Sequence, residues 1–127
     1  MLGRLKRGIL SNAVYNRSNL REHLYTMKTG TILLVDDNAD FRALFRQALK
    51  SKNVDLVTHD TAITALEYLR SAAELPALTL VDLRMPEMSG EEFIQTVRSD
   101  AQLKDLKVVV TSGWNNLGSV AKNIGAD

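Results

Sequence analysis

The sequence predicts an α/β fold in which helices cover both faces of a parallel sheet. Short apolar runs alternate four times with amphipathic segments, and the connections between them are short. Parallel strands need crossover connections, usually helices, and strands that are buried on both faces read as unbroken apolar runs. Polar side chains follow three of the runs. We therefore expect a doubly wound sheet that carries these side chains at its carboxyl edge.

Composition is that of one soluble globular domain. The chain has 127 residues, of which 45% are hydrophobic and 24% are charged, and these values are ordinary. The absence of cysteine excludes disulfides and thiolate metal sites. No apolar run approaches the roughly 20 residues that span a bilayer, and we find no apolar core of a secretory signal near the N-terminus. We interpret the protein as cytoplasmic, without a transmembrane segment.

The net charge of +1 conceals an uneven distribution of charge. Residues 1–30 contain six Lys or Arg against Glu22 alone, a balance of +5, so residues 31–127 carry −4. A basic segment can bind nucleic acid or an anionic membrane, but these charges are sparse and few aromatic residues accompany them. The pattern therefore disfavours nucleic acid as a partner.

We divide the chain into a basic N-terminal extension, residues 1–30, and a domain, residues 31–127. The extension has apolar residues at helical spacing up to position 26, interrupted by glycine, serine and asparagine. Met27 precedes the first strong strand and would serve as a natural start. Two interpretations of the extension stay open: an upstream segment without a role in function, or an amphipathic arm that docks on the domain, a partner or a membrane surface.

The first half of the domain contains two strand and helix pairs. A strand at 31–35 ends at Asp36 and Asp37, and Asn38 or Asp40 can cap the next helix. The apolar residues of that helix recur at i, i+3, i+4, i+7 and i+8; they are Phe41, Leu44, Phe45, Ala48 and Leu49. The strand at 54–58 is more polar, which suits a sheet edge. The helix capped by Thr61 turns one apolar face inward, made of Ala62, Ala65, Leu66 and Leu69.

The second half contains the same alternation. A strand at 78–81 ends at Asp82, and a loop with Pro86 and Gly90 follows. Ser89 and Glu92 have the spacing of a capping box that opens a helix. A fourth strand at 107–112 ends in hydroxyl side chains, including Ser112. The last predicted helix carries Leu117, Val120, Ala121 and Ile124.

The predicted carboxyl edge brings Asp36, Asp37, Asp82 and Ser112 together. Alone, each has a structural interpretation, as a helix cap or a turn residue, but their joint placement favours a site. Clustered carboxylates raise one another's pKa unless a cation is present, and oxygen-only ligands suit Mg²⁺. Mg²⁺ beside a carboxylate nucleophile indicates an aspartyl phosphate, with Ser112 hydrogen-bonded to a phosphoryl oxygen.

Four motifs give the chain a family resemblance. They are LVDDN at 34–38, VDLRMPEMSG at 81–90, VTSG at 110–113 and GAD at 125–127. Over residues 31–127 the chain resembles the receiver domain of two-component response regulators, in particular the chemotaxis regulator. The resemblance implies a flavodoxin-like doubly wound sheet of strand order 2-1-3-4-5.

The resemblance also implies roles for single residues. Asp82 would be the phosphoacceptor and Ser112 the switch hydroxyl. Asp36, Asp37 and Asp82 would hold Mg²⁺ with the backbone carbonyl of Arg84. The phosphoryl group would come from a histidine kinase, a phosphotransfer protein or a small phosphodonor, so the domain would catalyse its own phosphorylation without a separate substrate.

The sequence departs from the family after Asp127. The family's fifth strand, its phosphate-pairing lysine and its fifth helix would follow there, so we expect an incomplete domain with strands in the order 2-1-3-4. The fourth strand would then have an exposed edge, and the helix after Asn38 would expose part of its apolar stripe of Phe41, Leu44, Phe45 and Leu49. Both features would favour dimers unless the N-terminal extension covers the gap.

Two other functions stay open. The domain could act through protein contacts without phosphorylation, because the lysine is missing. A hydrolase that uses Asp82 as a nucleophile is disfavoured, since the sequence offers no insertion to shape a substrate pocket.

Overall fold

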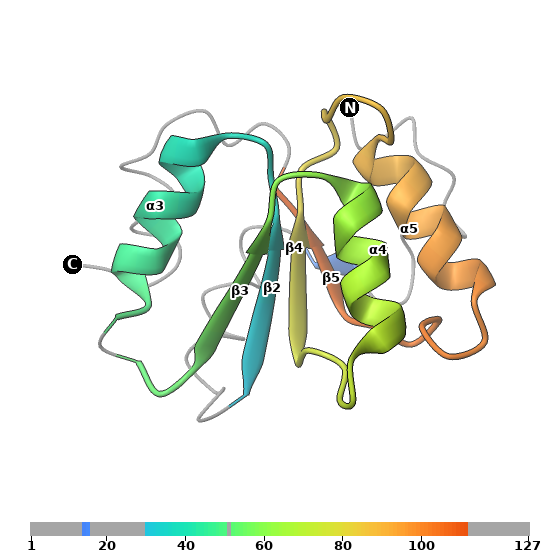
Figure 1. Ribbon diagram of the computed structural model, residues 1–127, viewed down its shortest axis with the longest axis horizontal. Coiled ribbons are helices and arrows are strands. Elements are labelled where there is room, and N and C mark those ends of the chain that lie inside the picture. Colours follow the sequence, from blue (N-terminus) through green and yellow to red (C-terminus); the bar gives the residue numbers. More distant parts are fainter. Residues whose placement is uncertain (1–13, 16–29, 51, 112–127) are drawn as a thin grey trace.

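The computed structural model describes residues 14–15, 30–50 and 52–111. Within them the elements follow in the order β1 (Val14–Tyr15), β2 (Thr31–Val35), α3 (Ala39–Ala48), β3 (Asp55–His59), α4 (Ala62–Ser71), β4 (Leu78–Val81), α5 (Gly90–Ser99) and β5 (Val108–Val110). The strands form one sheet, with α3 on one face and α4 and α5 on the other (Figure 1).

All strand pairs in the sheet are parallel, and the order is β1-β5-β4-β2-β3. The four strands predicted from the sequence therefore have the predicted order 2-1-3-4, which confirms the flavodoxin-like arrangement. The polar strand β3 lies at an edge, as expected. Boundaries differ slightly, since β3 begins at Asp55 rather than at residue 54, and β5 is shorter than predicted.

The outermost strand next to β5 comes from the N-terminal extension. Val14 pairs with Val108, and Tyr15 pairs with Val109. The helical spacing of residues 1–26 is therefore a wrong prediction at Val14 and Tyr15, because the β5 edge offers backbone groups that an extended segment can satisfy. The described part of the β5 edge is paired rather than open. The helix predicted after Gly113 lies outside the described residues.

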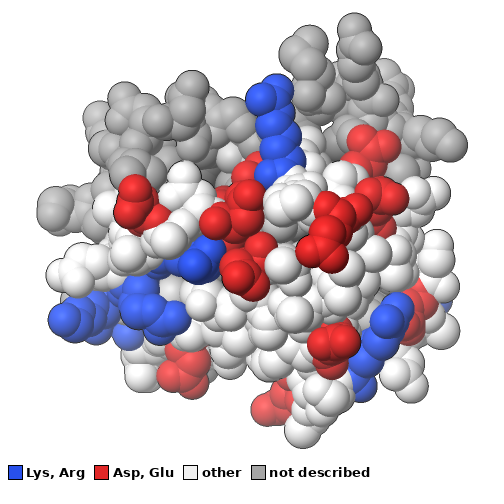
Figure 2. Space-filling model, turned by 45° about the horizontal axis from the view of Figure 1, so that its top comes forward, with Lys and Arg blue, Asp and Glu red and all other residues white. Residues whose placement is uncertain are grey.

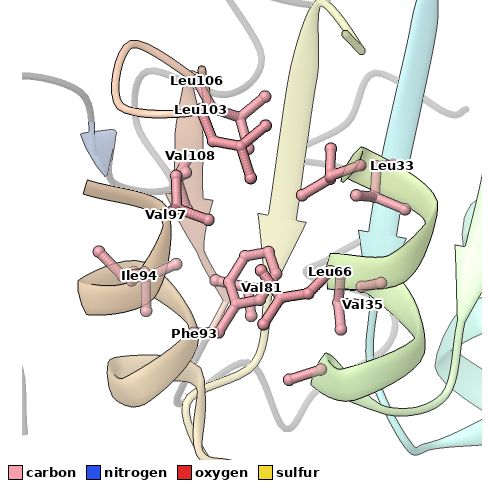
Figure 3. Packing of buried hydrophobic residues seen from close by; sticks show 14 residues of the cluster. Leu33, Val35, Leu66, Val81, Phe93, Ile94, Val97, Leu103, Leu106 and Val108 are labelled. Carbon is pink, nitrogen blue, oxygen red and sulfur yellow. The ribbon is translucent and has the colours of Figure 1, made fainter. Parts of the chain in front are cut away.

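The larger half of the core lies between the sheet and helices α4 and α5. Figure 3 shows side chains of both helices and of β2, β4 and β5 meeting there. The members with no exposed surface include Leu33, Val35, Val81, Phe93, Ile94, Val97 and Val108. All four residues predicted for the inner face of α4 are buried. This packing fixes the ends of β2 and β4 relative to each other.

The smaller half of the core lies under α3. Phe41, Phe45 and Leu49 are buried, and Leu44 is half-buried. The predicted exposure of this apolar stripe is therefore wrong for those three residues, because they pack on the sheet, with Ile32, Leu34, Leu78, Leu80 and Val109 in the same cluster. The rings of Phe41 and Phe45 meet edge to face, 5.9 Å apart between centroids.

Candidate functional site

Asp36 and Asp82 occupy equivalent positions at the carboxyl ends of two neighbouring strands. Val35 at the end of β2 pairs with Val81 at the end of β4. The backbone N–H of Asp82 donates to the carbonyl of Val35 at 3.1 Å, and that of Asp36 donates to His59 on the other side at 3.0 Å. The sheet register itself therefore places the two carboxylates side by side.

Asp36, Asp37 and Asp82 form one cluster. A carboxylate oxygen of each lies within 4.8 Å of the others. Asp36 is only 5% exposed, Asp82 is half-buried and Asp37 is exposed. Figure 2 shows acidic side chains gathered on this side of the molecule, with basic side chains near them. The convergence predicted from the sequence is present for these three residues.

Burial changes the proton affinity of two of these acids. The pKa of Asp36 is raised to about 6, mainly by burial and to a smaller extent by the charges of Asp82 and Asp37, while a hydrogen bond from the backbone N–H of Asn38 lowers it. Burial also raises the pKa of Asp82, opposed chiefly by a hydrogen bond from the Arg84 backbone. The sequence predicted that repulsion would raise these pKa values, but burial is the larger cause.

Short local hydrogen bonds orient both carboxylates. The N–H of Asn38 donates to Asp36 Oδ1 at 2.8 Å, and the N–H of Arg84 donates to Asp82 Oδ1 at 3.1 Å. Asn38 also caps α3, since its own Oδ1 accepts from the N–H of Phe41. After β2, Asn38 therefore sets both the start of α3 and the direction of the Asp36 carboxylate. After β4, the Arg84 backbone orients the Asp82 carboxylate, whereas α5 begins further along the chain.

Gly90 brings the loop after β4 back onto the strand end. Its N–H donates to the carbonyl of Leu83 at 3.0 Å. A Cβ at this position would lie 2.3 Å from the carbonyl oxygen of Asp82 and 2.7 Å from the Cα of Leu83. The sequence predicted Gly90 only as a loop residue. The capping box beside it is present as predicted, between Ser89 and Glu92.

Arg42 is a site residue that the sequence analysis did not single out. It is half-buried on α3, and its Nη1 donates to the backbone carbonyl of Asp36 at 2.8 Å. No motif marks this contact, because it depends on how α3 leaves the sheet. Its only sequence signal is a basic residue on the first turn of the helix that follows the acidic pair.

Comparison with known proteins identifies the family. The sequence model described as the response regulator receiver domain matches residues 32–127. The chain belongs to this family. It is thus a receiver domain of two-component signalling, and the family and fold predicted from the sequence motifs are confirmed.

Individual relatives agree with this assignment. The receiver domain is 33% identical over 84 residues to the two-component response regulator ORR5 of Oryza sativa subsp. japonica, and 31% identical over 81 residues to the sensor histidine kinase CheAY of Helicobacter pylori. These matches cover 66% and 64% of this chain, but 62% and 10% of the two relatives.

The phosphorylated cyanobacterial phytochrome response regulator RcpA has a similar solved structure. It is 30% identical, with a TM-score of 0.62, and the match covers 78% of this chain and 77% of RcpA.

The residues of the receiver domain fit a hard divalent cation. Three carboxylates that converge without histidine or cysteine are the donor set that Mg²⁺ prefers. Arg84 lies two residues beyond Asp82 and contacts it through its N–H, whereas a ligand role for its carbonyl stays a prediction. Ser112 lies outside the described residues. None of the described helices has both the length and the apolar character needed to cross a membrane.

Proposed function

We propose that Asp82 accepts a phosphoryl group and that the phosphorylated receiver domain changes its protein contacts. The observation that carries this proposal is the cluster of Asp36, Asp37 and Asp82 within 4.8 Å at one sheet edge. Asp82 comes directly from the buried strand β4. A nucleophile on a rigid strand, beside two carboxylates that can hold a cation, suits phosphoryl transfer, which depends mainly on positioning and charge neutralisation.

The chemistry needs one bond to form and one to break. An oxygen of the Asp82 carboxylate attacks the phosphorus atom of the donor, and the bond from phosphorus to the donor's leaving group breaks. Backbone N–H groups of Arg84 and Leu83 lower the pKa of Asp82 and so favour the carboxylate that this attack requires. A bound Mg²⁺ would neutralise charge on the transferred group, with Asp36 and Asp37 as its protein ligands.

The remaining roles follow from the family. Ser112 would hydrogen-bond the phosphoryl group and report its presence. The donor would be a histidine kinase, a phosphotransfer protein or a small phosphodonor, and we place this exchange in the cytoplasm. The domain would have no separate substrate, because it is itself the acceptor.

Incubation with acetyl phosphate and Mg²⁺ tests this function. We expect intact-mass spectrometry to detect a single added phosphoryl group. Asp82→Asn should abolish the addition, because the nucleophile is lost, and Asp37→Ala should weaken Mg²⁺ binding. Ser112→Ala should leave phosphoryl uptake largely intact.

Asp60→Asn is the matched control, since Asp60 is exposed just after β3 and lies outside the acidic cluster. It should behave as the unaltered protein does. Phosphate found on Ser112 or His59 would contradict the assignment. A folded protein that takes up no phosphate would instead support a receiver domain that works through contacts alone.

A further inference from the structure

We infer that Arg42 is a positioning residue that holds the peptide between Asp36 and Asp37 in the orientation needed for cation binding. The inference rests on the proposed metal role of these two acids. It starts from one contact, in which Nη1 of Arg42 donates to the Asp36 carbonyl at 2.8 Å. A side chain on α3 thus reaches back to the strand end that precedes its own helix.

Both backbone groups of Asp36 and one of its carboxylate oxygens are held by described partners. Its N–H donates to the His59 carbonyl, and its Oδ1 accepts from the N–H of Asn38. Arg42 holds the other backbone group, the carbonyl. The backbone of β3 and the start of α3 therefore fix one side of the residue, and Arg42 fixes the other.

The carbonyl of Asp36 and the N–H of Asp37 belong to one planar peptide unit. Fixing the carbonyl therefore fixes the plane from which the Asp37 side chain departs. Asp37 is exposed, and its carboxylate has no hydrogen bond to another described residue. Among the described residues, its direction toward Asp36 and Asp82 is therefore set by its own backbone, and the Arg42 side chain contacts this peptide.

The charge of Arg42 and its positioning role predict opposite effects of an Arg42 substitution on the affinity for Mg²⁺. The guanidinium charge of Arg42 acts on the Asp36 carboxylate and repels a Mg²⁺ ion bound there, so loss of this charge alone would tighten Mg²⁺ binding. Loss of the positioning bond would weaken binding, because Asp37 would no longer be held near the other two acids. The charge effect is screened in this partly exposed site, so we expect the positioning effect to be larger.

Mg²⁺ binding to the full chain, measured by calorimetry, tests the inference. Arg42→Met removes the guanidinium but keeps an apolar stem on the helix, and it should weaken Mg²⁺ binding about five- to tenfold. Arg42→Lys keeps a cation that can donate to a carbonyl and should restore binding to within about twofold. Phosphorylation by acetyl phosphate should need more Mg²⁺ in Arg42→Met, but should reach the unaltered rate at saturating Mg²⁺.

Arg46→Met is the matched control. Arg46 lies about one turn further along α3 and is exposed, and its Nη2 contacts Thr58 Oγ1 at 3.4 Å, outside the acidic cluster. Its replacement should leave Mg²⁺ binding unchanged.

Equal or tighter Mg²⁺ binding by folded Arg42→Met, with circular dichroism like that of the unaltered protein, would overturn the inference. If Arg42→Met fails to fold, Arg42→Lys provides the test, and the quantity measured is the Mg²⁺ concentration that gives half-maximal phosphorylation. A change of at most about twofold in this concentration supports the inference. A lower concentration than the unaltered protein needs contradicts it. Absence of Mg²⁺ binding in the unaltered protein would instead refute the proposed metal site.

Discussion

Asp36 combines burial with a position among other acids, and its proton affinity follows from both. Its pKa of about 6 lies above the usual 3.8. The folded state therefore binds this proton more tightly than the unfolded state does. The resulting stabilisation is complete below about pH 4 and is lost as the pH rises through about 6.

We expect the melting temperature of the metal-free protein to fall between about pH 4 and pH 7. Mg²⁺ should raise it mainly above pH 6, where the carboxylates are ionised. Asp36→Asn should flatten the metal-free profile, because the amide does not titrate. Melting curves with and without Mg²⁺ measure this, and identical pH profiles for the unaltered and Asp36→Asn proteins would contradict it.

Gly90 has a second constraint besides its place in the loop. Alanine normally favours a helix over glycine by about 1 kcal/mol, but here a Cβ would meet the Asp82 carbonyl. Gly90→Ala should therefore destabilise the protein, by about 1–3 kcal/mol in urea unfolding. It should also weaken Mg²⁺ binding, because the end of β4 must move.

Glu91→Ala is the control for this substitution, since it changes the next, exposed position of α5. It should change stability by less than about 0.5 kcal/mol. If the Gly90→Ala protein is as stable as this control, the backbone near Asp82 accommodates the added Cβ without loss of stability, and the prediction is wrong.

The acidic site was predictable from the sequence only in part. Asp36, Asp37 and Asp82 follow apolar runs, and the shared edge of a parallel sheet brings them together whatever the loops do. The contact of Arg42 with Asp36 depends on how helix α3 packs near the end of β2. The close approach of Gly90 depends on how the loop after β4 folds back onto the end of that strand. Such contacts leave no periodic pattern in the sequence.

At the scale of the element, the capping box of α5 joins the site loop to the core. Ser89 Oγ accepts from the N–H of Glu92 at 3.1 Å, and Glu92 Oε1 accepts from the N–H of Ser89 at 3.0 Å. The helix that starts here buries Phe93, Ile94 and Val97. Its first turn therefore fixes the loop that carries Arg84.

We expect Ser89→Ala to cost about 0.5–2 kcal/mol of stability, because it leaves a backbone N–H of the first turn without its partner. Thr96→Ala is a matched control within the same helix, since Thr96 Oγ1 donates to a carbonyl, that of Glu92, and satisfies no unpaired N–H. In urea unfolding, the Thr96→Ala protein should have a free energy of unfolding close to that of the unaltered protein. Equal losses for both variants would contradict the capping argument.

The helices were predictable because their apolar spacing extends over ten residues, and the inner strands because they are unbroken apolar runs of four or five residues. Helix α3 has five apolar residues at helical spacing, and β2 and β4 are unbroken apolar runs. Strand β1 has two residues, too few to show any period, and it forms through pairing with a distant strand. Helical spacing therefore gives a wrong prediction at Val14 and Tyr15.

At the scale of the whole molecule, β1 makes part of the N-terminal extension a component of the sheet. We expect a protein that starts at Met27 to melt at a lower temperature than the full chain, or to dimerise, because it frees the β5 edge beside Val108 and Val109. Thermal melting and size-exclusion chromatography measure these two outcomes.

A point variant separates the strand from the rest of the extension. Tyr15→Pro keeps the chain length but removes a backbone N–H from β1, which a paired strand disfavours. It should shift stability in the same direction as the deletion, by a smaller amount. A shortened protein that remains an equally stable monomer would mean that β1 contributes nothing to the fold.

The pairing of β1 with β5 also sets an order of events during synthesis. Val14 leaves the ribosome early, whereas its partner Val108 belongs to the last strand of the described chain. At a translation rate of roughly 5–20 residues per second, the early strand waits for several seconds before its partner exists. Closing so long a segment also carries the largest entropy cost in the sheet. We therefore expect β2, β3 and β4 to assemble first and β1, the earliest of the described strands in the sequence, to dock after them.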